Sequence, residues 1–137
     1  MDTADLRARF ASRPVARLST VRPDGRPHVV PCVFALLGDT VYTAVDAKPK
    51  RSARLQRLTD VRAEPRCALL VDHYEEDWAR LWWVRADGHA EIVEQPSPDH
   101  PGIRALVARF PQYREEPPSG ALLVVTVDHW TGWSGSS

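Results

Sequence analysis

The sequence predicts a mainly β protein whose antiparallel strands form a closed or partly split barrel, with short helices in the connections. Two observations support this fold class. Segments with strand-like alternation follow one another through tight turns, at Pro23-Asp24-Gly25 and at Gly38-Asp39. Twelve prolines in 137 residues also suit turns, strand starts and helix ends better than a helix bundle. An open α+β sandwich is the alternative that the same pattern allows.

The first third of the chain is expected to hold one helix and a three-stranded meander. The helix lies in the N-terminal segment 1–13, over residues 3–12, where Leu6 and Phe10 share one face. Thr3 is its candidate N-cap, and Pro14 ends it. Antiparallel strands are then expected over residues 15–22, 26–37 and 40–45.

The rest of the chain is expected to mix helices with longer strands. A helix is predicted over residues 52–61, because Leu55, Leu58 and Val61 recur at helical spacing and Ser52 is a candidate N-cap. The other expected elements are a strand at 67–71, one long strand or hairpin at 79–94 with a turn or bulge at Asp87-Gly88, a helix at 102–110 and a last strand at 121–133.

Composition indicates one small cytoplasmic domain over residues 1–137, with a flexible tail at 134–137. The 18 basic and 18 acidic residues cancel, which argues against nucleic acid as a partner. No apolar run could span a membrane, and the first residues do not resemble an export signal. Cys32 and Cys67 are few and far apart, which favours free thiols, and the five histidines show no metal-ligand spacing. We therefore expect no membrane contact and no metal site.

The strongest chemical signal is a basic segment directly before the second predicted helix. Lys48, Lys50 and Arg51 place three cations where a helix already carries partial positive charge. This arrangement is locally unfavourable unless an anion binds there and accepts hydrogen bonds from the free backbone N–H groups. A solvated surface turn is the alternative interpretation. The placement at a helix start favours an anion site.

The tryptophans are the second signal, because five are more than a small core requires. Trp82 and Trp83 are neighbours in a predicted strand, so their side chains face opposite sides of the sheet. One can pack in the core. The other is expected to meet solvent, a ligand or a second subunit.

Three segments carry a family resemblance. They are LSTVRPDGRPHVVPCVF at 18–34, VYTAVDAKPKRSARLQRL at 41–58 and LWWVRADGHAEIVE at 81–94. In this order and spacing they resemble the pyridoxamine-phosphate-oxidase-like (FMN-binding) split-barrel flavoproteins, above all the actinobacterial branch that uses the deazaflavin coenzyme F420. The resemblance covers nearly the whole chain. It implies a split β-barrel and a homodimer with two cofactor clefts at the dimer interface.

The resemblance also implies which residues hold the cofactor. In this family the basic segment after the third strand binds the cofactor phosphate, and the second and third strands lie against the ring. Trp78 matches an aromatic position near the cofactor, and Trp82 or Trp83 is a candidate to close the cleft from the partner subunit. The residues carried over are Lys48, Lys50, Arg51 and Ser52 for the phosphate, and Val30, Pro31, Cys32, Thr43 and Ala44 for the ring.

The function expected from these observations is hydride transfer between coenzyme F420 and a small electron-poor acceptor, such as an activated alkene or a quinone. An FMN-dependent oxidoreductase of the same fold is one alternative. A non-catalytic carrier of a flavin, a deazaflavin or haem is the other. The ending DHWTGWSGSS lacks the Arg and His residues that bind the substrate phosphate in pyridoxamine phosphate oxidase, so that reaction is not expected. No general acid stands out, and catalytic residues remain unassigned.

Overall fold

The computed structural model describes residues 1–45 and 52–136, with side chains described outside 52–55. These residues form four α-helices, a one-turn 3-10 helix and seven strands. The helices are α1 (Thr3–Ala11), α2 (Ser52–Ala63), η1 (Trp78–Arg80), α3 (Pro101–Arg109) and α4 (Pro111–Glu115). The strands are β1 (Val15–Val21), β2 (Pro27–Val33), β3 (Ala35–Leu37), β4 (Thr40–Ala44), β5 (Arg66–His73), β6 (Trp82–Val93) and β7 (Leu122–Ser134).

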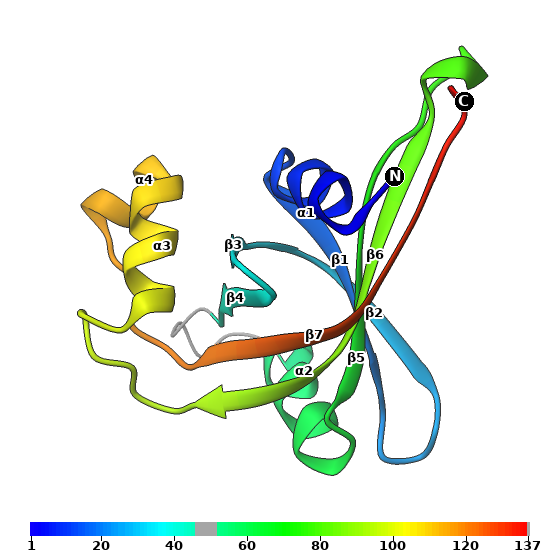
Figure 1. Ribbon diagram of the computed structural model, residues 1–137. Helices are drawn as coiled ribbons and strands as arrows, with labels where there is room; N and C mark the ends of the chain where they lie inside the picture. Colours follow the sequence, from blue (N-terminus) through cyan, green and yellow to red (C-terminus); the bar gives the residue numbers. More distant parts are fainter. Residues whose placement is uncertain (46–51, 137) are drawn as a thin grey trace.

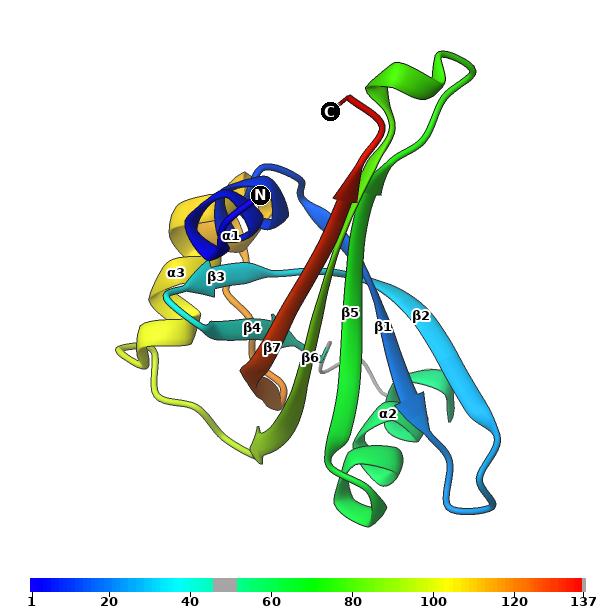
Figure 2. The same cartoon turned by 45° about the vertical axis from the view of Figure 1, so that its right-hand side comes forward.

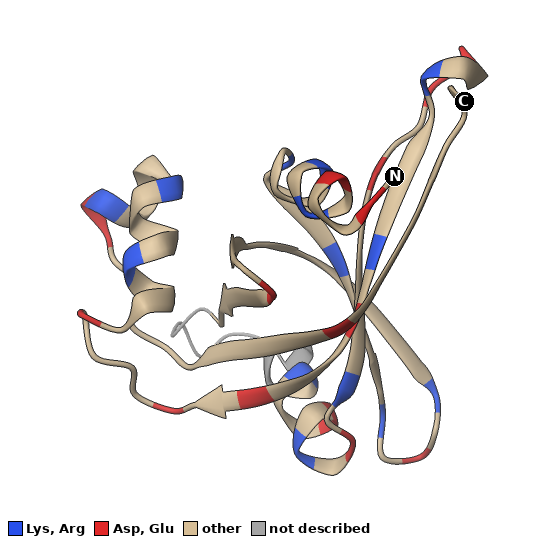
Figure 3. Cartoon of the chain, in the orientation of Figure 1, with Lys and Arg blue, Asp and Glu red and all other residues tan. Residues whose placement is uncertain are grey.

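The seven strands form one antiparallel sheet in the order β2-β1-β5-β6-β7-β4-β3. The sheet curls on itself into a half-barrel, and the short helices lie around it (Figures 1 and 2). The predicted mainly β split barrel is therefore confirmed. Figure 3 shows basic and acidic residues interspersed along the described chain. No helix in the described ranges is long and apolar enough to cross a lipid bilayer.

The prediction of one continuous strand over residues 26–37 is wrong, because the chain changes its position in the sheet at Phe34. Val33 ends β2 opposite Val15, and Ala35 begins β3 opposite Tyr42. β2 and β3 are the two edge strands of the sheet, so Phe34 alone links one edge to the other. The Phe34 side chain is buried in the core. This leaves a gap in the strand pairing between β2 and β4, which we call the seam.

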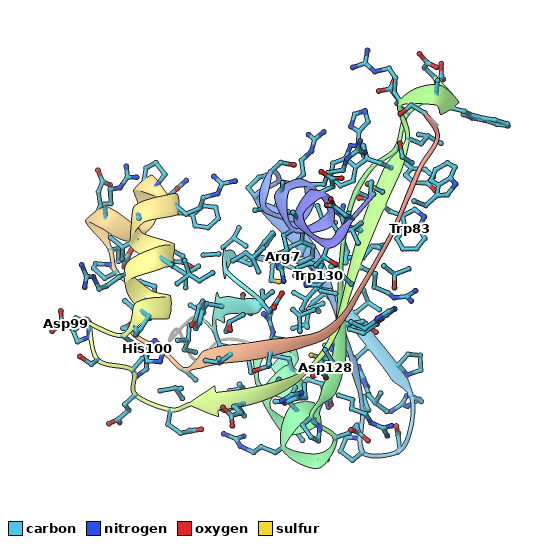
Figure 4. The ribbon with its side chains drawn as sticks, viewed as in Figure 1. Arg7, Trp83, Asp99, His100, Asp128 and Trp130 are labelled. Atoms are coloured by element: carbon cyan, nitrogen blue, oxygen red, sulfur yellow. The ribbon has the colours of Figure 1, made fainter. Side chains whose placement is uncertain are left out.

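The core fills the inside of the curled sheet, and α1 covers one end of it. Phe10 of α1 packs its ring against Phe34 at 4.8 Å between centroids and against Trp130 at 5.1 Å. Asp39, in the β3–β4 turn, accepts hydrogen bonds from Arg7 Nε at 2.7 Å and from Trp130 Nε1 at 2.9 Å. Figure 4 shows Arg7 and Trp130 converging below α1. The helix is therefore held to β7 and to the β3–β4 turn at once.

Two helix starts differ from their predictions. The N-cap of α1 is Asp2, not Thr3, because Asp2 and Asp5 form a reciprocal capping box in which each side chain accepts the other's backbone N–H. Ser52 is the first residue of α2 and not the residue before the helix, so it is not the N-cap. The helix also runs on to Ala63, two residues beyond the predicted end.

The ends of β5 and β7 and the segment that joins β5 to β6 project past the body of the molecule, and we call this projection the arm (residues 73–81 and 134–136; Figure 1). η1 forms its tip, and the Trp78 side chain there is 77% exposed. The C-terminal segment follows the arm, where Gly135 N donates to Leu81 O at 2.8 Å. The arm thus carries an exposed aromatic ring away from the core.

The pairing of β6 with β7 contains the predicted irregularity, between Asp87 and Gly88. A Cβ at Gly88 would lie 2.2 Å from the backbone oxygen of Thr126. We expect Gly88→Ala to lower the free energy of unfolding by about 3 kcal/mol, because backbone on both strands must move. Urea denaturation measures it.

Gly38→Ala is the control, since Gly38 has φ +60° but open space around it. Its expected cost is roughly 1 kcal/mol of backbone strain. A smaller loss at position 88 than at position 38 would contradict the close contact.

Candidate functional site

A cavity of about 370 Å³ opens at the seam, within the size range of small-molecule sites. Two walls come from the strands on either side of the seam, β2 and β4. The third comes from α2, and the fourth from α4 and the segment that follows it. The lining residues are Pro31, Cys32, Val33, Thr43, Ala44, Val45, Arg57, Gln112, Tyr113, Glu116, Pro117, Pro118 and Ser119.

The seam gives this cavity free strand edges. β3 pairs with β4 only as far as Tyr42, so no described strand pairs with Thr43 and Ala44 on the side away from β7. The Thr43 hydroxyl spans the gap and donates to Val33 O at 2.8 Å. Backbone N–H and C=O groups at such an edge need partners, and a ligand with a polar rim can supply them.

The structure brings four of the predicted ring contacts into this one cavity: Pro31, Cys32, Thr43 and Ala44. Val30 does not line it and packs against the core instead. Trp78 lies at the tip of the arm. Of the predicted phosphate ligands, Ser52 begins α2, whereas Lys48, Lys50 and Arg51 fall outside the described residues.

The sequence reasoning missed the two walls that helices supply. Arg57 comes from α2, and Gln112, Tyr113 and Glu116 come from α4 and its C-cap. A signal for α4 was present, because proline at a first helical position is favoured and Pro111 occupies one. No sequence pattern marks Arg57 as different from the other arginines of its helix.

A buried polar cluster fixes α2 against the sheet beside the cavity. The Asp60 carboxylate is fully buried and accepts hydrogen bonds from Thr20 Oγ1 on β1 and from Gln56 Nε2, both at 2.7 Å. His28 Nδ1 of β2 lies 3.7 Å from the same carboxylate. Leu58 and Val61 add apolar contacts on the same helix. The position of α2, and of the residues it presents to the cavity, is therefore tightly determined.

The two thiols are poorly ionised. Burial raises the pKa of Cys32, while a hydrogen bond with Thr43 and the Arg57 charge act in the opposite direction. Burial also raises the pKa of Cys67 to about 12, with further contributions from the Asp128 and Asp87 charges. A thiol with a raised pKa is a weak nucleophile. Within the described residues, no three His, Cys, Asp or Glu side chains gather as a metal site would require.

We therefore expect both thiols to react slowly with iodoacetamide in the folded protein. Between pH 9.0 and about 12, Cys67 is thiolate when unfolded but still a thiol when folded, so its folded rate should be far lower. The measurement is alkylation against pH, with and without urea, followed by mass spectrometry. Cys32→Ser and Cys67→Ser separate the two signals. Equal folded and unfolded rates would contradict the burial.

The outer side of the sheet carries a second concavity, a groove of about 510 Å³ over β1, β2, β5 and β6. Val29 and Tyr74 are 59% and 60% exposed there, and charged residues surround them. We call this surface the outer face: Arg17, Ser19, Val29, Ala68, Leu70, Asp72, Tyr74, Trp83 and Arg85.

The predicted opposition of Trp82 and Trp83 is confirmed. Trp82 packs against the core, with the guanidinium groups of Arg9 and Arg13 at 5.5 and 5.6 Å from its ring. Trp83 lies on the outer face under Arg85, and Figure 4 shows it pointing away from the core.

Comparison with known proteins bears on the fold and family. Residues 3–134 match the model of the family described as pyridoxamine 5'-phosphate oxidase. A search of the curated proteins found no match.

Several solved structures share the fold. A conserved hypothetical protein of Mycobacterium tuberculosis superposes with a TM-score of 0.78 at 22% identity, over 98% of this chain and 86% of that one. An FAD-binding protein of Mesorhizobium loti gives 0.70 at 20% identity, over 96% and 92%. HutZ, the haem storage protein of Vibrio cholerae, gives 0.71 at 15% identity, over 96% and 93%. At these identities the likeness establishes the fold alone.

Proposed function

This chain belongs to the pyridoxamine 5'-phosphate oxidase family, and from that premise we propose that it is an oxidoreductase that transfers a hydride between coenzyme F420 and a small electron-poor organic acceptor. The sequence resemblance to the deazaflavin-dependent branch favours F420 over FMN. The cavity at the seam is the proposed cofactor site.

The observation that carries the proposal is the convergence at the seam of four expected ring contacts. Pro31 and Ala44 offer apolar surface, while Thr43 and the free edge of β4 offer hydrogen-bonding groups. A flat ring with apolar faces and a polar rim fits this combination. When bound, such a cofactor supplies the hydride chemistry.

The protein's own contribution would be anchoring, orientation and exclusion of water. Lys48, Lys50, Arg51 and the start of α2 at Ser52 are the proposed phosphate anchor, because cations and free helix N–H groups both favour an anionic phosphate. The segment after α4, with Pro117 and Pro118, lines the cavity and would help to exclude water from a bound ring. Catalysis would then rest mainly on positioning.

The test is a titration of the purified protein with F420, FMN and haem, followed by fluorescence or absorbance. The tighter complex is then assayed for hydride transfer to activated alkenes and quinones. Binding and turnover with F420 support the proposal. Tight FMN binding without F420 binding would make FMN the cofactor. Binding without turnover on any acceptor favours a carrier. No binding of any of these overturns the proposal.

A matched pair of variants tests the place of binding. Pro31→Trp puts a large side chain into the cavity, whereas Pro27→Trp makes the same change on the same exposed face of β2, outside it. Only the first should weaken cofactor binding, measured in the same titration. Equal affinities of the two variants for the cofactor would show that it binds outside this cavity.

We further propose that two copies associate through the outer face. Its apolar groups, the exposed Val29 and Tyr74 and the half-buried Trp83, gain most from being covered, and a second copy carries the same groups. The arm projects beyond the body of its own subunit, so Trp78 is proposed to serve the cavity of the partner copy.

Val29→Glu is expected to turn the dimer into a monomer, because it buries a charge in the apolar centre of the interface. Sedimentation velocity measures the change. Leu37→Glu is the control, since Leu37 is 46% exposed on β3 and does not belong to the outer face. A monomeric wild-type protein, or a dimer in the Val29 variant, would exclude this interface.

A further inference from the structure

Arg57 holds a distinctive position in the cavity. Among the described lining residues it is the one cation, and it faces the site from α2. Its neighbours on the helix are fixed: Leu58 is buried in the core, and Asp60 is tied to β1 through Thr20. A guanidinium presented from such a rigid support needs little reorganisation to bind a ligand.

The location of Arg57 separates it from the proposed phosphate anchor. It follows Ser52 by five residues, which is roughly 7.5 Å along a helix axis. It lines the same cavity as Cys32 and Thr43, which are expected ring contacts. The positive charge of Arg57 acts to lower the pKa of the Cys32 thiol, against the larger effect of burial, in keeping with this proximity. The only described carboxylate of the lining, Glu116, belongs to the wall that α4 and its C-cap supply.

We infer that Arg57 binds the pyrimidine edge of the cofactor ring and favours its reduced form, an inference that rests on the proposed function. FMN and the deazaflavin share this edge, with its electron-rich nitrogen and carbonyl oxygen. A ring that accepts a hydride from a donor gains two electrons and one proton, and hence one negative charge, which this edge shares. A guanidinium at hydrogen-bond distance stabilises that charge more than it stabilises the oxidised ring. Arg57 is therefore a binding residue that also tunes the reduction potential.

The test compares Arg57→Gln and Arg57→Lys with wild type in two measurements. The first is the midpoint potential of the bound cofactor, by equilibration with a reference dye. We expect Arg57→Gln to weaken binding of the reduced form at least about tenfold more than that of the oxidised form, which lowers a two-electron potential by about 30 mV. Arg57→Lys should keep most of the wild-type potential, because it keeps the charge.

The second measurement distinguishes the ring from the phosphate. Arg57→Gln should lower affinity by the same factor for FMN and for riboflavin, which lacks the phosphate. If the protein binds only the deazaflavin, the same comparison is made between F420 and the phosphate-free deazaflavin. Arg62→Gln is the control, because Arg62 lies on the same helix, paired with Glu94 outside the cavity. Thermal unfolding checks that each variant folds.

Three results would overturn the inference. An unchanged potential in Arg57→Gln means that Arg57 does not sense the charge of the ring. A loss seen with FMN but not with riboflavin makes Arg57 a phosphate ligand, while the proposed function stands. If the wild-type protein binds neither cofactor, the proposed function fails, and this inference fails with it.

Discussion

Replacing Lys48 and Lys50 together by alanine is expected to weaken FMN or F420 binding by roughly 3–6 kcal/mol, because each charge-assisted hydrogen bond to a phosphate contributes about 1.5–3 kcal/mol. This corresponds to a loss of more than about a hundredfold in affinity. Riboflavin, which lacks the phosphate, should bind the variant and the wild type equally well. Titration with FMN and riboflavin in parallel measures both. Unchanged FMN affinity would refute the anchor.

The composition offers an independent test of the same segment. Lys48 and Lys50 are the only lysines in the sequence. An amine-specific reagent can therefore modify only these two side chains and the N-terminal amine. A bound phosphate should protect both lysines and leave the N-terminus reactive, which peptide mass spectrometry can resolve. Protection by FMN but not by riboflavin would place the phosphate at this segment.

Phe10→Ala is expected to lower the free energy of unfolding by about 3–5 kcal/mol, the usual cost of removing a large buried ring. Phe10 has no exposed surface, and it joins α1 to both Phe34 and Trp130. The loss of stability should exceed that from removing an equally buried ring elsewhere, because Phe10 packs on Phe34, the residue that links the two sheet edges. Denaturant unfolding followed by tryptophan fluorescence measures it.

Leu37→Ala is the matched control for this prediction. Leu37 lies at the end of β3 and is 46% exposed, so its truncation should cost about 0.5 kcal/mol or less. A Phe10 variant as stable as the Leu37 variant would show that α1 does not hold the barrel end closed.

The strands were predictable wherever alternation reflects one buried face. β1, for example, buries Ala16, Leu18 and Thr20 and turns the residues between them outward. The same two-residue alternation assigned the side chains of Trp82 and Trp83 to opposite faces of the sheet. The N-cap of α1 was harder to predict. Asp2 and Thr3 are both good N-cap residues, and only the reciprocal hydrogen bonds between Asp2 and Asp5 decide between them.

The break at Phe34 and the role of Arg57 could not be predicted from local sequence. Residues 26–37 keep a strand-like pattern throughout, and the change of sheet edge at Phe34 depends on where β1 and β4 lie. Arg57 likewise reads as one of several helix-surface cations until the fold places it at the seam. The strand contacts with the cavity were named from family resemblance, whereas the helical walls required the three-dimensional structure.

The single-residue link at Phe34 sets the order in which the binding site can be assembled. Along the chain only β3 separates β2 from β4, yet each is held in place through the other strands, and β4 pairs with β7 at residues 122–126. Pairings between distant segments form late in folding, because long loops must close first. β7 supplies none of the described lining residues, but without it β4 has no neighbour other than β3. During synthesis, the chain should therefore acquire its affinity for cofactor only after β7 has left the ribosome.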